Sequence, residues 1–192
     1  MCVLKSITTL LLIVLLAACQ TAPQRSASGM PAAPSGFQWY TATNGAGSFL
    51  QPNGWFSKEE QQGNTAALFV TLENLAVNGR FETGMSVKRL QSFSAKQKGQ
   101  ASGFAREQAS RLATTGKVLI NRVMSGPGYQ MYVVRVAGDR QGKLVTVHHM
   151  VLAADEADVL YMISMESPSA SWDQHYPQMR MMLDLFYPNL KP

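Results

Sequence analysis

The three histidines are the side chains of this sequence best suited to bind a metal ion or to act as general bases. His148 and His149 are adjacent in a segment with the pattern of a strand, so their side chains point to opposite faces and cannot hold one metal together. His175 lies at the edge of the apolar face of an expected helix. A metal site would need carboxylates such as Glu166 or Asp173, and no spacing in the sequence brings them to a histidine. We therefore expect structural imidazoles, with no metal and no cofactor.

The sequence patterns of common catalytic sites are absent as well. There is no G-x-S-x-G, no H-E-x-x-H, and no S-x-x-K at the start of an expected helix. The glycine-rich turn at 126–129 contains a proline and precedes no helix, so it does not present a row of amides to a phosphate. We expect a protein without catalytic activity. An enzyme that uses His148 or His149 with Glu166 is kept as the third hypothesis.

The cysteine at position 19 follows a short apolar run with the order of parts of an export signal. Lys5 precedes an uncharged stretch over 7–18, which is too short to span a bilayer as a helix and ends in Leu16-Ala17-Ala18-Cys19. This ending resembles the bacterial lipobox, whose cysteine is lipidated and becomes the first residue of the mature protein. The resemblance implies a signal peptide over residues 1–18 and acyl chains, palmitate among them, on Cys19.

The lipobox resemblance also implies a location. Several acyl chains, at ~0.8 kcal/mol per buried methylene, hold a protein stably on a membrane. In bacterial lipoproteins an Asp after the lipidated cysteine favours retention in the inner membrane, and here that residue is Gln20. We expect a lipid-anchored protein of the bacterial cell envelope, at the periplasmic face of the outer membrane. Cys2 is removed with the signal peptide, so the mature chain forms no internal disulfide and its fold rests on its core.

The mature chain divides into a linker and one domain. Residues 20–36 contain three Pro, two Gly and no apolar period, which predicts a flexible linker behind the lipidated cysteine. Residues 37–192 are enough for one globular domain. Period-two patterns bounded by turn residues predict nine strands in it, at 37–40, 48–50, 55–61, 65–73, 85–91, 117–124, 130–137, 143–153 and 159–166.

Two segments have the spacing of amphipathic helices. The first places an apolar face between Ala101 and Leu112 and ends before Gly116. In the second, Ser171 and Gln174 match a capping box, and Pro177 predicts either a kink or a helix that begins there. The apolar face of this second helix consists of Trp172, Tyr176, Met179, Leu183 and Phe186, and Pro188 ends it.

The last two predicted strands are apolar on both faces of the pleat. A strand of this kind lies inside a sheet that is covered on each side. The short turns between the predicted strands make neighbouring strands antiparallel. The sequence therefore predicts an α+β fold, in which an antiparallel β-sheet is flanked by helices.

Two runs of the chain resemble the PsbP-like fold, whose members form an α/β/α sandwich. The early hairpin of that fold, with an aromatic residue, Pro, Gly and Trp, is similar to Phe49-Leu50-Gln51-Pro52-Asn53-Gly54-Trp55. Its closing strand, loop and helix are similar to Tyr161-Met162-Ile163-Ser164 followed by Trp172, Tyr176, Met179 and the run Met182-Leu183-Asp184-Leu185-Phe186. The family includes PsbP of photosystem II, a Ran-binding nuclear transport factor, DcrB-type bacterial lipoproteins and secretion-effector chaperones. Because most of these members bind other macromolecules, the resemblance implies a binding protein over residues 37–192.

Basic residues concentrate in one part of the chain. Residues 80–122 contain nine Lys or Arg against two Glu, whereas the rest of the mature chain has an acidic excess. Such asymmetry attracts acidic partners, and the compartment and the lack of interleaved aromatic residues argue against nucleic acid. The alternative is a solvated surface that only keeps the domain soluble. The candidate partner-binding basic surface consists of Lys88, Arg89, Lys96, Lys98, Arg106 and Arg111.

Met181 and Leu185 are the candidate apolar contacts, because they fall opposite the apolar face of the last helix. Taken together, these observations make a membrane-anchored, non-catalytic lipoprotein that binds a protein partner the leading hypothesis. A carrier of lipid or of a small amphiphile, with a pocket between sheet and helix, is the alternative.

Overall fold

The computed structural model describes residues 29–97 and 99–190, so Cys19 and Lys98 lie outside the described residues. Residues Ala33–Pro192 form one compact unit. Within residues 29–97 and 99–190, no helix is long and apolar enough to cross a membrane.

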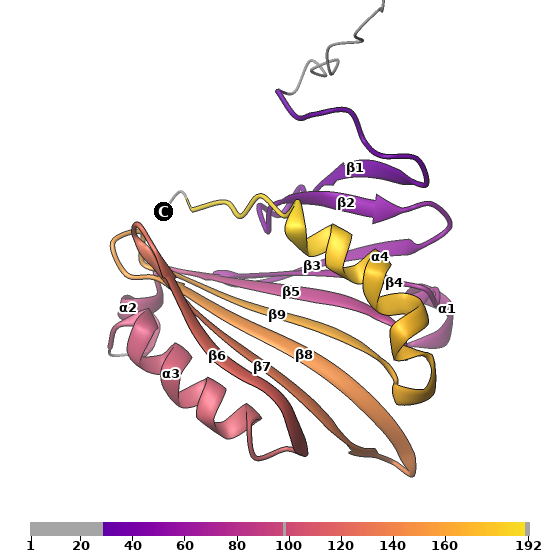
Figure 1. The fold of residues 1–192 in the computed structure, drawn as a ribbon. Helices are drawn as coiled ribbons and strands as arrows, with labels where there is room; N and C mark the ends of the chain where they lie inside the picture. The colour runs from indigo at the N-terminus through magenta and orange to yellow at the C-terminus, as the bar shows by residue number, and fades with distance from the viewer. Residues whose placement is uncertain (1–28, 98, 191–192) are drawn as a thin grey trace, which may run out of the picture. The chain divides into compact units, whose positions relative to one another are not determined.

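Nine strands form two antiparallel sheets in the part of the chain that the structure describes. A small sheet consists of β1 (Phe37–Thr41) and β2 (Ser48–Pro52). The other seven strands form one sheet in the order β3-β4-β5-β9-β8-β7-β6, and all neighbours are antiparallel (Figure 1). These strands are β3 (Phe56–Gln62), β4 (Thr65–Thr71), β5 (Gly84–Gln91), β6 (Lys117–Gly126), β7 (Tyr129–Arg140), β8 (Lys143–Ala154) and β9 (Val159–Pro168).

The strand predictions are confirmed. Each of the nine predicted ranges coincides with a strand of the structure to within three residues at either end. The two strands that are apolar on both faces are β8 and β9, and they lie side by side in the interior of the seven-stranded sheet. Both faces of these strands are apolar because the sheet is covered on both sides at this position.

Four helices and one 3-10 turn accompany the strands among the described residues. The two predicted helices are α3 (Ala101–Leu112) and α4 (Trp172–Asp184). The sequence did not predict α1 (Leu75–Asn78) or α2 (Phe93–Gln97), because a helix of four or five residues has too few turns for a helical period to show. The 3-10 turn covers Ser169–Ser171 and leads directly into α4.

The start of α4 differs from the predicted capping box. Ser171 precedes the helix, but its side chain makes no capping hydrogen bond and its Oγ donates to the carbonyl oxygen of Pro168 instead. The 3-10 turn causes this difference, because it occupies the position where an extended N-cap residue would stand. The helix begins at Trp172, so the predicted alternative of a helix that begins at Pro177 is wrong. Pro177 lies inside the helix and is exposed.

Helices α3 and α4 cover opposite faces of the large sheet, named here the α3 face and the α4 face (Figure 1). The predicted α+β class, with an antiparallel sheet flanked by helices, is therefore confirmed. The core of the α4 face includes Met179 and Met182 of α4, Phe49 of β2, Leu68 of β4 and Tyr161 of β9. The core of the α3 face includes Phe93, Ala101, Ala105, Val151 and Leu160.

The C-terminal segment after α4 is joined to the α4 face by Arg89 and Tyr161. Arg89 Nε donates to the backbone carbonyl oxygen of Asn189 at 2.9 Å, and Tyr161 Oη donates to the same oxygen at 3.0 Å. The backbone N–H of Asn189 donates back to Tyr161 Oη at 2.8 Å. Burial raises the pKa of Tyr161 to about 12, so the phenol keeps its proton.

This position corrects the sequence prediction for Arg89. The side chain is 1% exposed, so Arg89 is not part of an exposed basic surface. Lys88 and Arg89 are successive residues of β5 and therefore point to opposite faces of the sheet. Of these two residues, only Lys88 is exposed.

Candidate functional site

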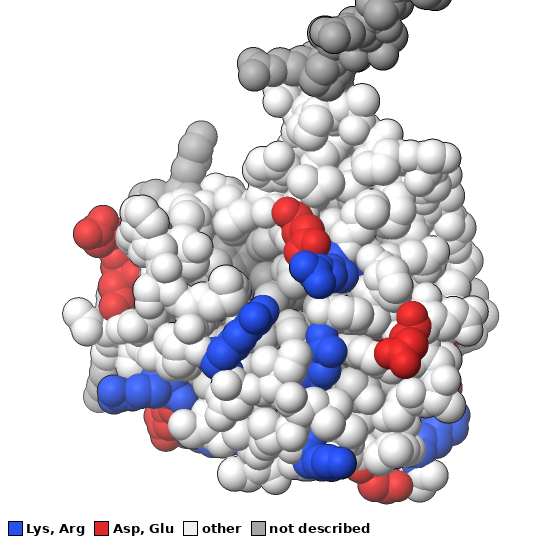
Figure 2. All heavy atoms as spheres, viewed as in Figure 1, with Lys and Arg blue, Asp and Glu red and all other residues white. Residues whose placement is uncertain are grey.

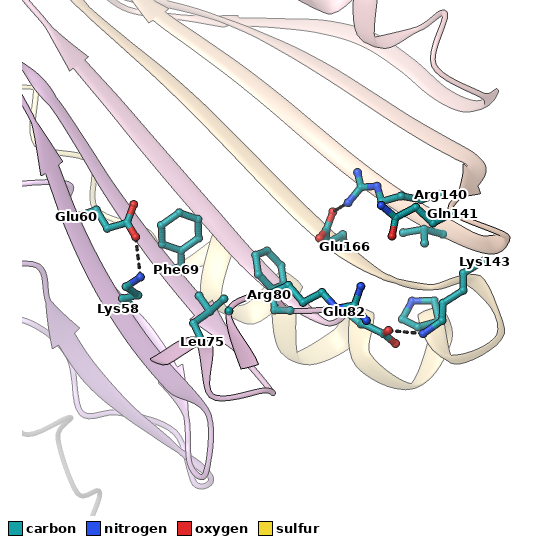
Figure 3. Close-up of a pocket in the computed structure, with 14 residues that line it drawn as sticks. Lys58, Glu60, Phe69, Leu75, Arg80, Glu82, Arg140, Gln141, Lys143 and Glu166 are labelled. Atoms are coloured by element: carbon teal, nitrogen blue, oxygen red, sulfur yellow. Dashed lines mark hydrogen bonds and ion pairs between the residues drawn. The ribbon is translucent and has the colours of Figure 1, made fainter. Parts of the chain in front are cut away.

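A groove of about 650 Å³ lies on the α3 face (Figure 3). Helix α3 packs against β7, β8 and β9 and leaves the β3–β4 side of this face uncovered. The groove begins at β3 and β4, passes α1 and the loop at 79–82, and ends at the turn between β7 and β8. Its volume lies within the range of roughly 300–1,000 Å³ that is usual for ligand sites.

The floor of the groove is apolar. Phe69 of β4 and Phe81 of the loop meet edge to face, with their ring centroids 6.3 Å apart. Leu75 reaches the groove from α1. The side chain of Asn74 caps the start of this helix by accepting a hydrogen bond from the backbone N–H of Ala76. Val145 completes the floor on the β8 side. Aromatic and aliphatic groups in a hollow favour a ligand with an apolar part.

Charged side chains stand around this floor, and most are committed to ion pairs. Lys58 Nζ lies 2.8 Å from Glu60 Oε1 on β3. Arg140 Nη1 lies 2.6 Å from Glu166 Oε2, which joins the end of β7 to β9. The third pair joins Lys143 to Glu82. Figure 3 shows the Lys58–Glu60 pair at one end of the groove and the other two pairs at the opposite end.

Arg80 is the lining cation that has no ion-pair partner among residues 29–97 and 99–190. It is exposed and lies in the loop between α1 and β5. Its charge lowers the pKa of Glu82, after the larger effects of the hydrogen bond and the charge of Lys143. A guanidinium with free donors beside an apolar floor can bind a carboxylate or another anionic group.

The polar side chains that line the groove in the described part of the chain are mostly charged. Its lining contains no Ser, Thr, Cys, His or Tyr that could act as a nucleophile or a general base. The three carboxylates that line it, Glu60, Glu82 and Glu166, each form an ion pair with a neighbouring cation.

The two adjacent histidines point to opposite faces, as the strand pattern predicted. His148 lies on the α4 face, where its ring centroid is 6.1 Å from that of Tyr176 and its Nδ1 accepts from Arg135 Nε at 3.1 Å. His149 lies on the α3 face beside Leu112. Burial, followed by the charges of Arg135, Arg122 and His149, lowers the pKa of His148 to about 4. Burial, followed by the charge of Arg140, lowers the pKa of His149 to about 4. Both imidazoles are therefore neutral at pH 7.

His149 forms a hydrogen-bonded pair with a serine that the sequence did not single out. His149 Nδ1 and Ser164 Oγ are 2.8 Å apart, because the two residues are direct partners in the register of β8 and β9. No carboxylate hydrogen-bonds to this imidazole in the described part of the chain, and its low pKa makes it a poor base. Glu166, the carboxylate of the enzyme hypothesis, is paired with Arg140 instead. No group of three His, Cys, Asp or Glu side chains in residues 29–97 and 99–190 could hold a metal ion.

The remaining residues of the candidate basic surface lie on three elements. Lys88 of β5 is exposed on the α3 face, Lys96 of α2 is exposed, and Arg106 and Arg111 lie on the outer side of α3. Arg111 Nη2 is 2.6 Å from Glu107 Oε1, so its charge is partly neutralised. Lys98 lies outside the described residues. Binding of a partner at this surface stays a prediction.

Met181 and Leu185 are placed at the end of α4. Met181 is 37% exposed, whereas its neighbour Met182 is completely buried in the core of the α4 face. Leu185 follows the last residue of the helix and is half-buried. A contact with a partner at these two residues also stays a prediction.

Comparison with known proteins gives a structural likeness only. No model of a protein family matches the sequence, and no curated protein matches it. The solution structure of the cyanobacterial PsbP of Synechocystis is 15% identical over 81% of this chain and 94% of its own, with a TM-score of 0.48. The Ran-binding protein Mog1p of Saccharomyces cerevisiae is 14% identical over 81% and 96%, with a TM-score of 0.46. LpqN, involved in cell envelope biogenesis of Mycobacterium tuberculosis, is 9% identical over 79% and 92%, with a TM-score of 0.48.

Proposed function

We propose that this chain is a non-catalytic, protein-binding lipoprotein that holds its sheet domain at the periplasmic face of the outer membrane. The groove on the α3 face receives part of the partner protein. The observation that carries the proposal is the composition of this groove: an apolar floor, three ion pairs around it, and one guanidinium, that of Arg80, without an ion-pair partner among the described residues. Surfaces with an apolar centre and a charged margin are typical of protein interfaces.

The anchor in this proposal is Cys19, on the basis of the sequence Leu16-Ala17-Ala18-Cys19. Growth of cells with an alkyne-labelled palmitate tests it. The unaltered chain is expected to incorporate the label and to sediment with outer membranes. The variant Cys19→Ser is expected to do neither, and labelling of that variant would contradict the anchor.

Site-specific photo-crosslinking in intact cells tests the groove. A photoreactive phenylalanine analogue in place of Leu75 faces the groove. The same analogue in place of Val77 is the matched control. Val77 belongs to the same short helix and is 78% exposed, but it does not line the groove. We expect one discrete protein adduct from position 75 and none from position 77. The same pattern of adducts from both positions, or no adduct from 75, would contradict a protein-binding groove.

A carrier of a small anionic amphiphile is the second candidate function, and the free guanidinium of Arg80 beside the apolar floor favours it. Native mass spectrometry of the full chain with dodecanoic acid distinguishes the two functions. A carrier retains one molecule of the acid, and Arg80→Gln weakens its retention. A clean ligand-free mass under gentle conditions removes this candidate and leaves the protein-binding groove.

A further inference from the structure

Strand β6 leaves its outer edge open. It is the last strand of the seven-stranded sheet and pairs only with β7 in residues 29–97 and 99–190 (Figure 1). The opposite edge strand, β3, is contacted by the loop between β1 and β2, where Asn44 Nδ2 donates to the carbonyl oxygen of Glu60 at 3.0 Å. An open edge presents a row of unpaired backbone N–H and C=O groups to which another strand can hydrogen-bond.

The length and composition of β6 fit such pairing. The strand has ten residues, and nearly all of them are exposed. Val118 and Val123 are 43% and 55% exposed, and Leu119 and Met124 are also largely accessible. A register shift between Val118 and Ile120 interrupts the first part of the strand, so the regular stretch runs from 120 to 126. Exposed apolar residues on an open edge of this length are unusual unless a second strand covers them.

The two faces of β6 carry different chemistry. Arg122 is the register partner of Val133, which belongs to the core of the α4 face, so Arg122 points to the α4 face. Lys117 is the partner of Ala137, four residues along β7 from Val133, and therefore points to the same face. Val123 is the partner of Tyr132, which packs on the α3 face. A strand beside β6 thus meets Lys117 and Arg122 on the α4 face, where Ile120 and Met124 also lie. On the α3 face it meets Val118 and Val123, with Asn121 between them and no cation of β6.

Three cations near β6 on the α4 face have no acidic partner in the described part of the chain. Lys117, Arg122 and Arg135 form no ion pair within the described ranges. Arg135 lies over the ring of Tyr176 with its Cζ 4.3 Å from the ring centroid, and it points to the same face. Figure 2 shows blue side chains over the region of β6, β7 and β8, and no red side chain between them. This part of the surface attracts negative charge.

We propose that the outer edge of β6 binds an extended segment of a partner protein in which acidic and apolar residues alternate. The acidic residues lie on the α4 face near Arg122 and Lys117, and the apolar residues lie on the α3 face beside Val123. This inference does not rest on the groove, because no residue of β6 lines the groove.

Charge decides against two other occupants of this edge. A second copy of the chain could pair antiparallel through its own β6. The α4 faces of both copies would then lie on the same side of the joined sheet, so the basic residues of one copy would lie next to those of the other. Like charges that face each other across strands are destabilising. The chain's own residues 20–36 contain no Asp or Glu and three Pro, so they supply neither the charge nor an unbroken set of N–H donors.

Binding of short synthetic peptides to the full chain in a neutral detergent tests the proposal. The probe is the capped heptapeptide Glu-Val-Glu-Val-Glu-Val-Glu. The first control contains the same residues in blocks, Glu-Glu-Glu-Glu-Val-Val-Val, and the second has Lys in place of Glu. Fluorescence anisotropy measures the affinities, and hydrogen exchange shows which amides the peptide protects.

We expect the unaltered chain to bind the probe at least tenfold more tightly than either control, with protection confined to 117–126. The double variant Lys117→Glu/Arg122→Glu should reverse the preference between the Glu and Lys peptides by at least tenfold, and Arg122→Gln should give an intermediate shift. The control variant Lys96→Glu makes the same change of charge as Lys117→Glu, but on α2. It should alter the affinity for the probe peptide less than twofold.

Equal affinity for the Glu and Lys peptides would overturn the proposal, as would protection outside 117–126. Self-association of the chain alone, measured by sedimentation and removed by Val123→Lys, would overturn it in favour of a second copy.

Discussion

Arg140 and Glu166 form an ion pair that links the last residue of β7 to β9, with Nη1 and Oε2 separated by 2.6 Å. The Glu166 side chain is only 13% exposed, whereas that of Arg140 is 57% exposed. The pair forms part of one end of the groove, beside the Lys143–Glu82 pair. The carboxylate is thus largely desolvated and depends on Arg140 to neutralise its charge.

Glu166→Gln tests this pair. The amide retains the size of the side chain but loses the charge, so we expect the free energy of unfolding to fall by about 1 kcal/mol, measured by urea denaturation. Glu107→Gln is the matched control, because it breaks the exposed Arg111–Glu107 pair on α3 and should cost less than ~0.5 kcal/mol. Equal effects of the two substitutions would contradict the account of the buried carboxylate.

The two neutral histidines predict an acid-sensitive fold. Their pKa values are about 4 in the folded chain and about 6.5 in the unfolded chain, so the unfolded chain binds more protons between these pH values. The free energy of unfolding should therefore fall as the pH falls from 6.5 towards 4, by roughly 1–2 kcal/mol per histidine at pH 5. The double variant His148→Gln/His149→Gln should lose less stability than the unaltered chain between pH 7.5 and 5. Identical losses would contradict the low pKa values.

Gly47 lies where the C-terminal segment meets β2. Its φ is +132°, and a Cβ there would come within 2.7 Å of the carbonyl oxygen of Tyr187 and 2.8 Å of Phe186 Cε2. We expect Gly47→Ala to lower the free energy of unfolding by about 2 kcal/mol or more. Gly54→Ala is the control, since φ is +81° there but no atom lies within 4 Å of the added carbon. A larger loss at position 54 would contradict the docking of the C-terminal segment.

Met181 and Met182 distinguish the two sides of α4. Met182 is completely buried in the core of the α4 face, so Met182→Ala should cost about 2–5 kcal/mol in thermal or urea unfolding. Met181 is 37% exposed and lies outside the core, so Met181→Ala should cost much less, below ~1 kcal/mol. A larger loss of stability from Met181→Ala than from Met182→Ala would show that α4 presents its other side to the sheet.

The strands and the two longer helices could be predicted because each carries its own period. Apolar residues on both faces of β8 and β9 predicted that these strands lie inside the sheet. The rule that successive side chains of a strand point to opposite faces would have separated Arg89 from Lys88, had it been applied to β5. Local patterns do not contain the strand order, however. Pairing of β5 with β9 joins residues that are distant in the sequence, such as Met85 and Met165, which are 80 positions apart.

That long-range pairing explains why the groove could not be predicted. Its lining comes from β3, β4, the loop at 79–82 and the turn between β7 and β8, which only the strand order brings onto one face. The pairing of His149 with Ser164 likewise depends on the register of β8 and β9. The open edge of β6 is also a property of the strand order, which places this strand at the end of the sheet.

The most direct test of the proposed protein-binding groove is hydrogen–deuterium exchange of the full chain, with and without the partner that cross-links through position 75. The proposal predicts slower exchange at 75–82 and 140–145, which line or flank the groove, and unchanged exchange in α3 at 101–112. Protection confined to α3, or no change at 75–82 when the partner is bound, would contradict the groove as the binding site.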